Sequence, residues 1–223
     1  MSTPRPTADA ASAAAMLSLR WTTRIISEID DNGPIPRGAA QATFPDIPED
    51  NLQHGMRSLR HRGLLQVREN RGDDSPLELT QAGQDLGDVY EALSRWARKH
   101  HYPAPQTGFV TRIESTLVLL RDRHTVSLLS APSAMPYGYK ARRALHAGLI
   151  SAGPDGRYAL TAAGGELRQA LAVLSNWAAE HPQVVMATAS RRPGRPTTEI
   201  HRVAGHVLPQ IHAGSGHPPR SAR

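Results

Sequence analysis

The chain has 223 residues, no cysteine and a formal net charge of +6 at pH 7. This length suits two small domains, and the lack of cysteine excludes disulfides, thiolate metal sites and thiol-based sensing of redox state or electrophiles. No run approaches the roughly 20 apolar residues that a membrane span needs, so we expect no membrane partner and a cytoplasmic location.

The positive charge is not spread evenly along the chain. Residues 183–223 hold six arginines and one acid, Glu199, and carry +5, which leaves +1 for residues 1–182. Arginine outnumbers lysine 24 to 2. A guanidinium binds guanine edges and phosphates through paired hydrogen bonds, although a GC-rich genome would produce the same bias. Any basic binding face within residues 1–182 must therefore be local.

Residues 1–15 are rich in alanine, and we expect a flexible N-terminus there. Three helices are predicted next. The first ends before a run of turn formers and a proline, and its apolar face holds Trp21, Ile25, Ile26 and Ile29. A short second helix is predicted over 36–42. The third is predicted over 49–61, with Leu52, Met56 and Leu59 facing inward.

A hairpin and a long helix are predicted to follow. Residues 64–68 and 77–79 have strand character and flank a turn-rich stretch. Gly63 is suited to end the preceding helix, because glycine tolerates a left-handed backbone. Thr80 is a good N-cap for the last helix, whose buried face would hold Leu86, Val89, Leu93, Trp96 and Ala97. This order of elements is that of a winged helix-turn-helix.

The sequence also repeats itself. The set Leu79 to Gly83, Leu86, Leu93 to Ala97 and His100 returns 81 residues later as Leu160 to Gly164, Leu167, Leu174 to Ala178 and His181. Further upstream, Gly63 to Leu65 and Thr23 to Ile25 return at offsets of 85 and 88. Chance can match one tripeptide but not an ordered set of this length.

We therefore expect a mainly α fold with small β wings, in which two tandem winged helix-turn-helix modules form a pseudo-dimer. The modules are predicted over 16–102 and 107–182. Residues 183–223 are rich in proline, glycine, serine and arginine without a sustained apolar period, which predicts a disordered basic tail.

The chain resembles the HxlR-type transcription regulators. The residues that carry the resemblance are Arg20 to Thr22, the helix from Leu52 to Leu59, Gly63 to Leu65, the proline of the wing, Leu79, Thr80, Ala82, Gly83 and Leu93 to Trp96. The resemblance covers residues 18–101 well and 107–181 more loosely. It implies a bacterial, nucleoid-associated regulator that binds double-stranded DNA. Family members usually carry one module and form dimers, which implies that this chain is a covalent pseudo-dimer, complete alone or able to form a homodimer.

In a winged helix the third helix places polar side chains against bases in the major groove, and basic residues hold phosphates. For the first module we expect base contacts from Asn51 and Gln53 to adenine and from Arg57 to guanine. The predicted DNA-binding set of this module is completed by His54 and Arg60 on the helix and by Arg68 and Arg71 on the wing. The same pattern is also that of a solvated amphipathic face. Glu49, Asp50 and Gly55 depart from the family pattern.

The second module departs further, because Pro136 and Gly138 fall in its predicted third helix. We expect that helix to be short, with Lys140, Arg142 and Arg143 as candidate DNA contacts. In the tail, the stretch from Arg191 to Pro196 resembles an AT-hook, and Arg191, Arg192 and Arg195 would then lie in a narrow minor groove. A non-specific basic tail is the alternative.

No glycine-rich phosphate loop, nucleophile elbow or pair of carboxylates suited to acid–base chemistry is present, so we expect no enzyme and no cofactor. The four tail histidines match no compact metal motif. His100 and His181 are expected to meet terminal carbonyls of their helices, and Trp96 and Trp177 to be core or interface anchors. Two alternatives stay open: a sensor or sequestering protein with a small-molecule effector in a cavity between the modules, or a non-specific architectural DNA-binding protein.

Overall fold

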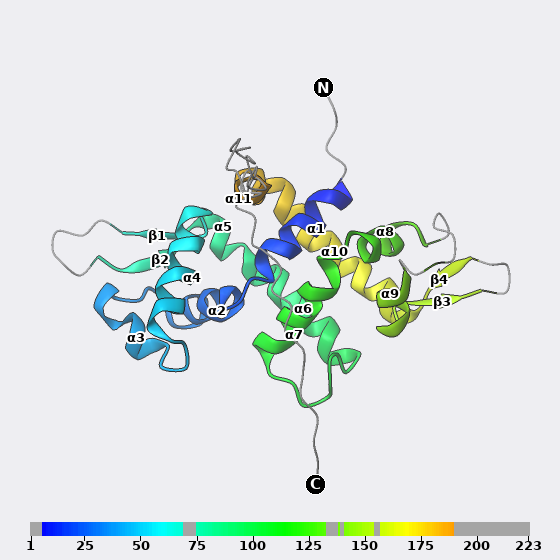
Figure 1. Cartoon of the computed structure of the whole chain (residues 1–223), viewed down its shortest axis with the longest axis horizontal. Coiled ribbons are helices and arrows are strands. Elements are labelled where there is room, and N and C mark those ends of the chain that lie inside the picture. Colours follow the sequence, from blue (N-terminus) through cyan, green and yellow to red (C-terminus); the bar gives the residue numbers. More distant parts are fainter. Residues whose placement is uncertain (1–5, 69–74, 133–137, 139–140, 154–156, 190–223) are drawn as a thin grey trace, which may run out of the picture. The chain divides into compact units, whose positions relative to one another are not determined.

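The structure is a computed structural model of the chain that describes residues 6–68, 75–132, 138, 141–153 and 157–189 (Figure 1). All of these residues belong to one compact unit. We call residues 16–102 the first half and residues 107–182 the second half. No helix within the described ranges has the length and apolar character needed to cross a bilayer.

The first half contains a helical cluster, a two-stranded sheet and a long helix. Its elements are α2 (Thr22–Asn32), the 3-10 turn η1 (Arg37–Ala39), α3 (Ala40–Thr43), α4 (Glu49–His61), β1 (Leu65–Val67), β2 (Leu77–Leu79), α5 (Gln81–Gln84) and α6 (Leu86–Lys99). The expected single helix over 36–42 is instead a 3-10 turn followed by the four residues of α3. Gly38, a weak helix former, lies within that turn.

Helices α2 and α4 pack through the apolar faces that the periodicity predicted. Ile25, Ile26 and Ile29 of α2 are buried, as are Leu52, Met56 and Leu59 of α4, which confirms these predictions. Gly55 lies where the two helices approach each other. A Cβ at that position would lie 3.1 Å from Cδ1 of Ile25. Close packing against α2 therefore favours a glycine at this position.

The sheet of the first half is antiparallel, with Leu65 paired to Leu79 and Val67 to Leu77. Ile35 forms a bridge to Leu77 through two backbone hydrogen bonds of 2.8 and 2.9 Å. The chain between α2 and α4 is thereby tied to the hairpin. This arrangement holds β1 and β2 beside α4 (Figure 1).

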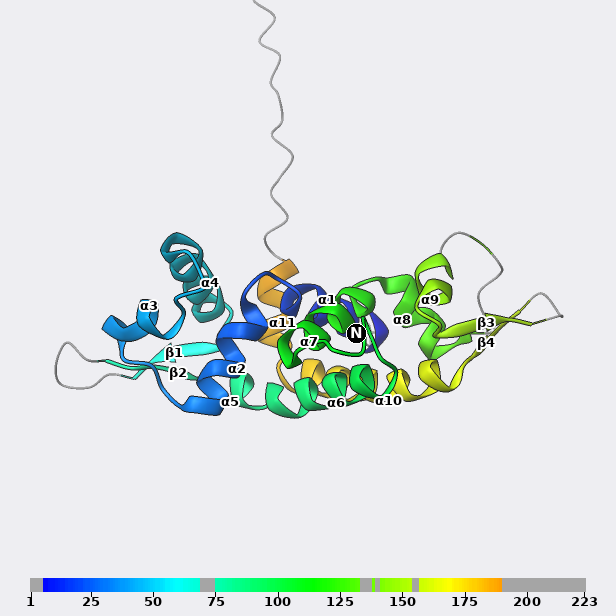
Figure 2. The ribbon, with the colours of Figure 1, turned by 90° about the horizontal axis from the view of Figure 1, so that it is seen from below.

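The second half has α7 (Phe109–Leu120), α8 (Arg123–Ser130), α9 (Arg142–His146), β3 (Ile150–Ala152), β4 (Tyr158–Leu160) and α10 (Ala162–Glu180). Strands β3 and β4 are antiparallel, with Ile150 paired to Leu160. Helix α9 has 5 residues where α4 has 13, which confirms the expectation of a short helix. The two hairpins lie on opposite sides of the α6–α10 pair (Figures 1 and 2).

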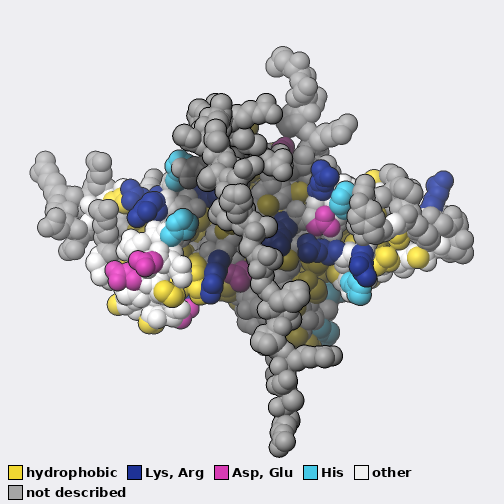
Figure 3. Space-filling view, in the orientation of Figure 1, with side chains coloured by type: hydrophobic (Ala, Val, Ile, Leu, Met, Phe, Trp, Pro, Cys, Tyr) yellow, Lys and Arg dark blue, Asp and Glu magenta, His cyan; other side chains and the backbone are white. Residues whose placement is uncertain are grey.

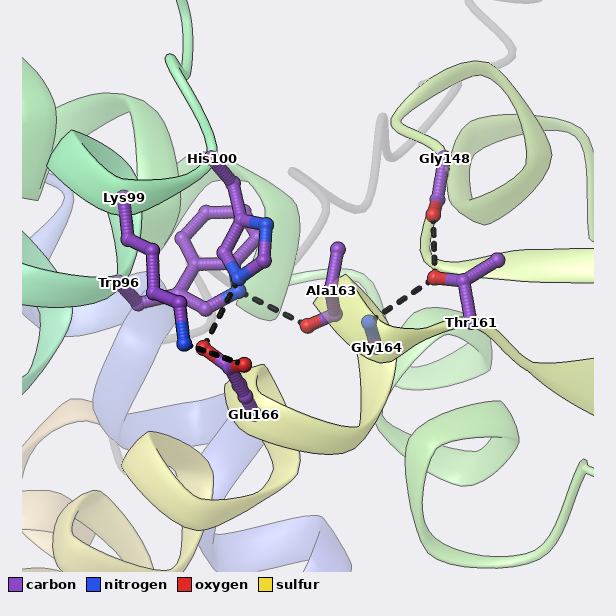
Figure 4. Close-up of polar contacts among 8 residues, drawn as sticks. All are labelled: Trp96, Lys99, His100, Gly148, Thr161, Ala163, Gly164 and Glu166. Carbon is purple, nitrogen blue, oxygen red and sulfur yellow. Dashed lines mark hydrogen bonds and ion pairs between the residues drawn. The ribbon is translucent and has the colours of Figure 1, made fainter.

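The recurring Gly-Leu and Leu-Thr-x-x-Gly sequences form the same hydrogen-bonded turn in each half. The Thr80 hydroxyl donates to Gly63 O (2.6 Å) and accepts from Gly83 N (3.2 Å). The Thr161 hydroxyl donates to Gly148 O (2.6 Å) and accepts from Gly164 N (3.1 Å) (Figure 4). One threonine thus caps a helix and holds the end of α4 or α9.

Glycine is required twice in this turn. Gly63 and Gly148 have φ angles of +75° and +66°, the left-handed conformation in which α4 and α9 end. A Cβ on Gly83 would lie 2.4 Å from Leu64 O, and one on Gly164 would lie 1.9 Å from Leu149 O. The recurrence in the sequence therefore reflects a steric requirement.

Helices α6 and α10 join the two halves through reciprocal contacts. The Trp96 indole N–H donates to Ala163 O (2.8 Å), and that of Trp177 donates to Ala82 O (3.0 Å). Trp177 lies 81 positions after Trp96 in the sequence, and Ala163 lies 81 positions after Ala82. Trp96 and Trp177 are 4% and 3% exposed. The expectation that these tryptophans are core or interface anchors is confirmed.

The two histidines extend the same pattern. His100 Nε2 lies 3.0 Å from Glu166 Oε2, and His181 Nε2 lies 2.9 Å from Asp85 Oδ2. Their partners are thus carboxylates of the opposite half, where terminal carbonyls were expected. Lys99 Nζ also contacts Glu166 at 2.7 Å (Figure 4). Hydrogen bonds from Lys99 and His100 lower the pKa of the Glu166 carboxyl.

Two further helices, α1 (Pro6–Leu17) and α11 (Pro182–Ala189), differ from the expected flexible ends at 1–15 and 183–223. Ala10, Ala13, Ala14 and Leu17 of α1 are fully buried and recur at helical spacing. Helix α1 packs on α7, α8, α10 and α11. Alanine is the best helix former and permits close approach, but its weak hydrophobicity conceals a buried helix in the sequence.

The hydrogen-bonded turn predicts unequal costs for two neighbouring glycines. Gly164→Ala should lower the free energy of unfolding by about 3 kcal/mol, because the added methyl meets a backbone oxygen that cannot move aside. Gly165→Ala should raise it by about 0.5 kcal/mol, because that helical site is open. Urea unfolding followed by circular dichroism measures both. Equal effects would contradict the steric reading.

The junction predicts a further difference between tryptophans. Trp96→Phe and Trp177→Phe should each cost about 1 kcal/mol, because each removes one indole donor. Trp21 is the matched control, since its indole nitrogen is buried and has no partner. Trp21→Phe should therefore cost less than either. If Trp21→Phe costs as much in guanidinium unfolding, ring packing and not the hydrogen bond stabilises the junction.

Candidate nucleic-acid interface

Helix α4 presents its predicted site residues to solvent. Leu52, Met56 and Leu59 face the core, and this orientation turns the remaining faces outward. The predicted residues of this helix are all exposed: Asn51, Gln53, His54, Arg57 and Arg60. The exposed surface is thus set by the same apolar period that builds the core.

Three of these side chains share one row of the helix. Gln53, Arg57 and Arg60 line a depression of about 210 Å³ whose other wall includes Val67 and Leu77 of the hairpin. Within the described ranges, their side chains make no hydrogen bond or ion pair. Asn51 and His54 do not line this depression. The structure therefore groups one amide and two guanidinium groups beside the hairpin, with free donors.

Charge changes sign along α4. Glu49 and Asp50 lie in its first turn, and Arg60 and His61 in its last. Both placements complement the helix dipole, and the first turn has no side-chain cap on Pro48. On the face drawn in Figure 3, basic and histidine side chains lie over the upper part of the first half, and acidic ones lie lower, with a further basic group beside them. The acids stabilise the helix start and leave the Gln53–Arg60 row free.

The hairpin contributes Arg68, and its charge is partly compensated. Arg68 Nε lies 3.1 Å from Glu78 Oε2, and Gln66 Nε2 donates to Glu78 Oε1 (2.9 Å). The Arg68 side chain is 60% exposed and the Glu78 side chain 15%. This pair was not predicted from the sequence, although the hairpin register places residues 66 and 78 opposite each other. Arg71 lies outside the described residues.

In the second half the basic residues surround a hollow. Arg142 and Arg143 are exposed on α9, and Arg143 Nη1 donates to Val118 O (3.2 Å) of α7. Both line a pocket together with Tyr102. Burial raises the pKa of the Tyr102 hydroxyl, and the charge of Arg143 opposes that rise. This pocket was not predicted from the sequence, because its lining residues come from three separate segments.

Lys140, Arg191, Arg192 and Arg195 lie outside the described residues, as do the four tail histidines. Within the described ranges, no group of three histidine or acidic residues could hold a metal ion.

The mainly helical fold with small antiparallel sheets is consistent with a winged helix-turn-helix. Residues 16–105 match the family model described as HxlR-like helix-turn-helix, which spans α2 to α6. Neither a curated protein nor a solved structure matches the chain. The family match indicates a DNA-binding transcription regulator.

Proposed function

We propose that the chain is a sequence-specific regulator that binds double-stranded DNA mainly through α4. The observation that carries this proposal is the row of Gln53, Arg57 and Arg60. It is exposed, free of internal partners and beside the hairpin, on the segment that matches the HxlR-like family. A helix with such a row fits the major groove, where side chains meet base edges.

Each side chain of the row has a chemical role in this proposal. The Gln53 amide pairs with the N6 and N7 edge of adenine, and the Arg57 fork with O6 and N7 of guanine. Arg60, one turn nearer the C-terminus, and Arg68 on the hairpin hold phosphates, which position the helix without reading sequence. Asn51 and His54, on the adjacent row, reach the bases or backbone on the other side of the helix.

We also propose that the two halves are tandem winged-helix repeats and form a pseudo-dimer. The reciprocal contacts support this. Trp96 meets Ala163 while Trp177 meets Ala82, and the histidine–carboxylate pairs follow the same offset. Contacts of the form i to j and j to i define a two-fold, isologous interface, here within one chain. The equivalent turns at Thr80 and Thr161 support the same conclusion.

The proposed repeats have unequal roles. Helix α4 has 13 residues and a free basic row, whereas α9 has 5 residues and its Arg143 is bonded to α7. We therefore assign base readout to α4 and, at most, phosphate contacts to Arg142 and Arg143. If both repeats contact one duplex face, their sites lie about one helical turn, ~34 Å, apart.

The sharpest test is a selection from a random duplex pool. The wild-type chain should enrich a motif, and Gln53→Ala with Arg57→Ala should lose it, because both base contacts are removed. Arg168→Ala with Gln169→Ala is the matched control: the same residue types are removed from an exposed part of α10. The control should enrich the wild-type motif.

Two outcomes would overturn the proposal. Equal binding of unrelated duplexes by the wild-type chain would indicate an architectural protein, as would a pool without a motif. Retention of the motif by the Gln53 and Arg57 double variant would remove α4 as the reader. Loss of the motif in the Arg168 and Gln169 control would show that the substitutions act by disturbing the fold and not by removing contacts to DNA.

The Arg68–Glu78 pair gives a second prediction. Glu78→Gln frees the Arg68 guanidinium for phosphate, so the variant should bind any duplex more tightly, by about threefold at low salt, and its affinity should fall more steeply with salt. Fluorescence anisotropy at several salt concentrations measures both quantities. Glu91→Gln, which frees Arg95 on α6, is the control and should change neither. If both variants bind the duplex more tightly, the increase in affinity comes from the change in net charge and not from release of Arg68.

A further inference from the structure

A pocket of about 640 Å³ lies where α7, α8 and α9 meet the chain that leaves α6. Its basic side is formed by Arg142 and Arg143, with His124 and His146 beside them. Its apolar side includes Tyr102, Val118 and Leu119. The volume lies within the roughly 300–1,000 Å³ typical of sites for small molecules.

The guanidinium groups of this pocket lack acidic partners. Asp122 is the acid among the described lining residues, and it is already engaged at the start of α8. Its Oδ1 accepts from His124 N (3.1 Å) and its Oδ2 from the Thr125 hydroxyl (3.0 Å). Neither Arg142 nor Arg143 forms an ion pair within the described ranges. The described lining residues thus hold two guanidinium charges against one carboxylate, and their net charge is positive.

A hydrogen bond to the backbone positions one of the two guanidinium groups, that of Arg143. Arg143 Nη1 donates to Val118 O at 3.2 Å, which holds the planar group against the pocket wall and leaves its other donors available. A positioned guanidinium fork matches a carboxylate through two parallel hydrogen bonds. Less side-chain freedom is then lost when an anion binds.

The side of the pocket that α7 and the chain after α6 form is apolar where the equivalent positions of the first half are acidic. Val118 and Leu119 stand 88 positions after Asp30 and Asp31, the offset that relates α2 to α7. Tyr102 completes this wall, and its ring lies 5.5 Å from that of Trp96 at the junction. The acidic pair would repel an anion, whereas the apolar pair and the tyrosine ring provide a surface for a flat hydrophobic body.

We propose that this pocket binds a small organic anion, with a carboxylate against Arg142 and Arg143 and an apolar ring system against Tyr102 and Val118. A DNA phosphate would use the same guanidinium groups but would gain nothing from the apolar wall. The proposal goes beyond DNA binding and is tested without DNA, so its failure and that of the regulator function are distinguishable.

The test is isothermal titration of the full-length chain with three probes: 2-naphthoate, the neutral 2-naphthamide and inorganic phosphate. Naphthoate should bind at least about tenfold more tightly than the amide, because only the carboxylate forms charged hydrogen bonds. It should also bind more tightly than phosphate, which lacks the apolar body. These comparisons use the wild-type chain and do not depend on the folding of a variant.

Variants then locate the site. Arg142→Gln with Arg143→Gln should weaken naphthoate binding at least about tenfold. Arg98→Gln with Arg168→Gln, exposed on α6 and α10, makes the same charge change elsewhere and should leave it unaltered. The proposal is overturned if naphthoate does not bind, if the amide or phosphate binds equally well, or if both double variants behave alike.

Discussion

The indole N–H groups of Trp96 and Trp177 each donate to a backbone carbonyl in the opposite half of the chain. The acceptors, Ala163 O and Ala82 O, each belong to the residue before the glycine of a Thr-capped turn. Each tryptophan therefore contacts the other half where the helix after that turn begins. The same turn receives the end of α4 or α9 through the threonine hydroxyl. A continuous series of hydrogen bonds therefore leads from the junction to the helix proposed to meet DNA.

The sequence predicted those elements whose determinants are local. The buried stripe of α4, the two hairpins, the Thr80 cap and the left-handed Gly63 all follow from periodicity, turn chemistry and steric limits. The same reasoning failed for α1, because an alanine stripe becomes a core only when other helices lie against it. It also misassigned the partners of His100 and His181, since carboxylates 66 and 96 positions away cannot be located from one helix. The candidate DNA row could be predicted, whereas the pocket beside α9 could not, because three segments form it.

The two halves share the same turn and packing contacts but differ in their solvent-facing side chains. The capped turn, the glycine that ends the third helix and the tryptophan contacts are repeated, because each is set by backbone geometry. Solvent-facing positions carry no such constraint. A long α4 with a free basic row therefore stands in one half, and a short α9 beside a hollow with apolar and basic walls stands in the other. Similar packing in the two halves thus supports two differently exposed surfaces.

The α6–α10 junction belongs to a single polypeptide. A dimer of separate chains falls apart on dilution, since its assembly depends on protomer concentration. Here the local concentration of one half around the other is fixed by the connection over residues 100–108 and does not change with expression level. The contacts between α6 and α10 therefore do not depend on how many copies of the protein a cell holds.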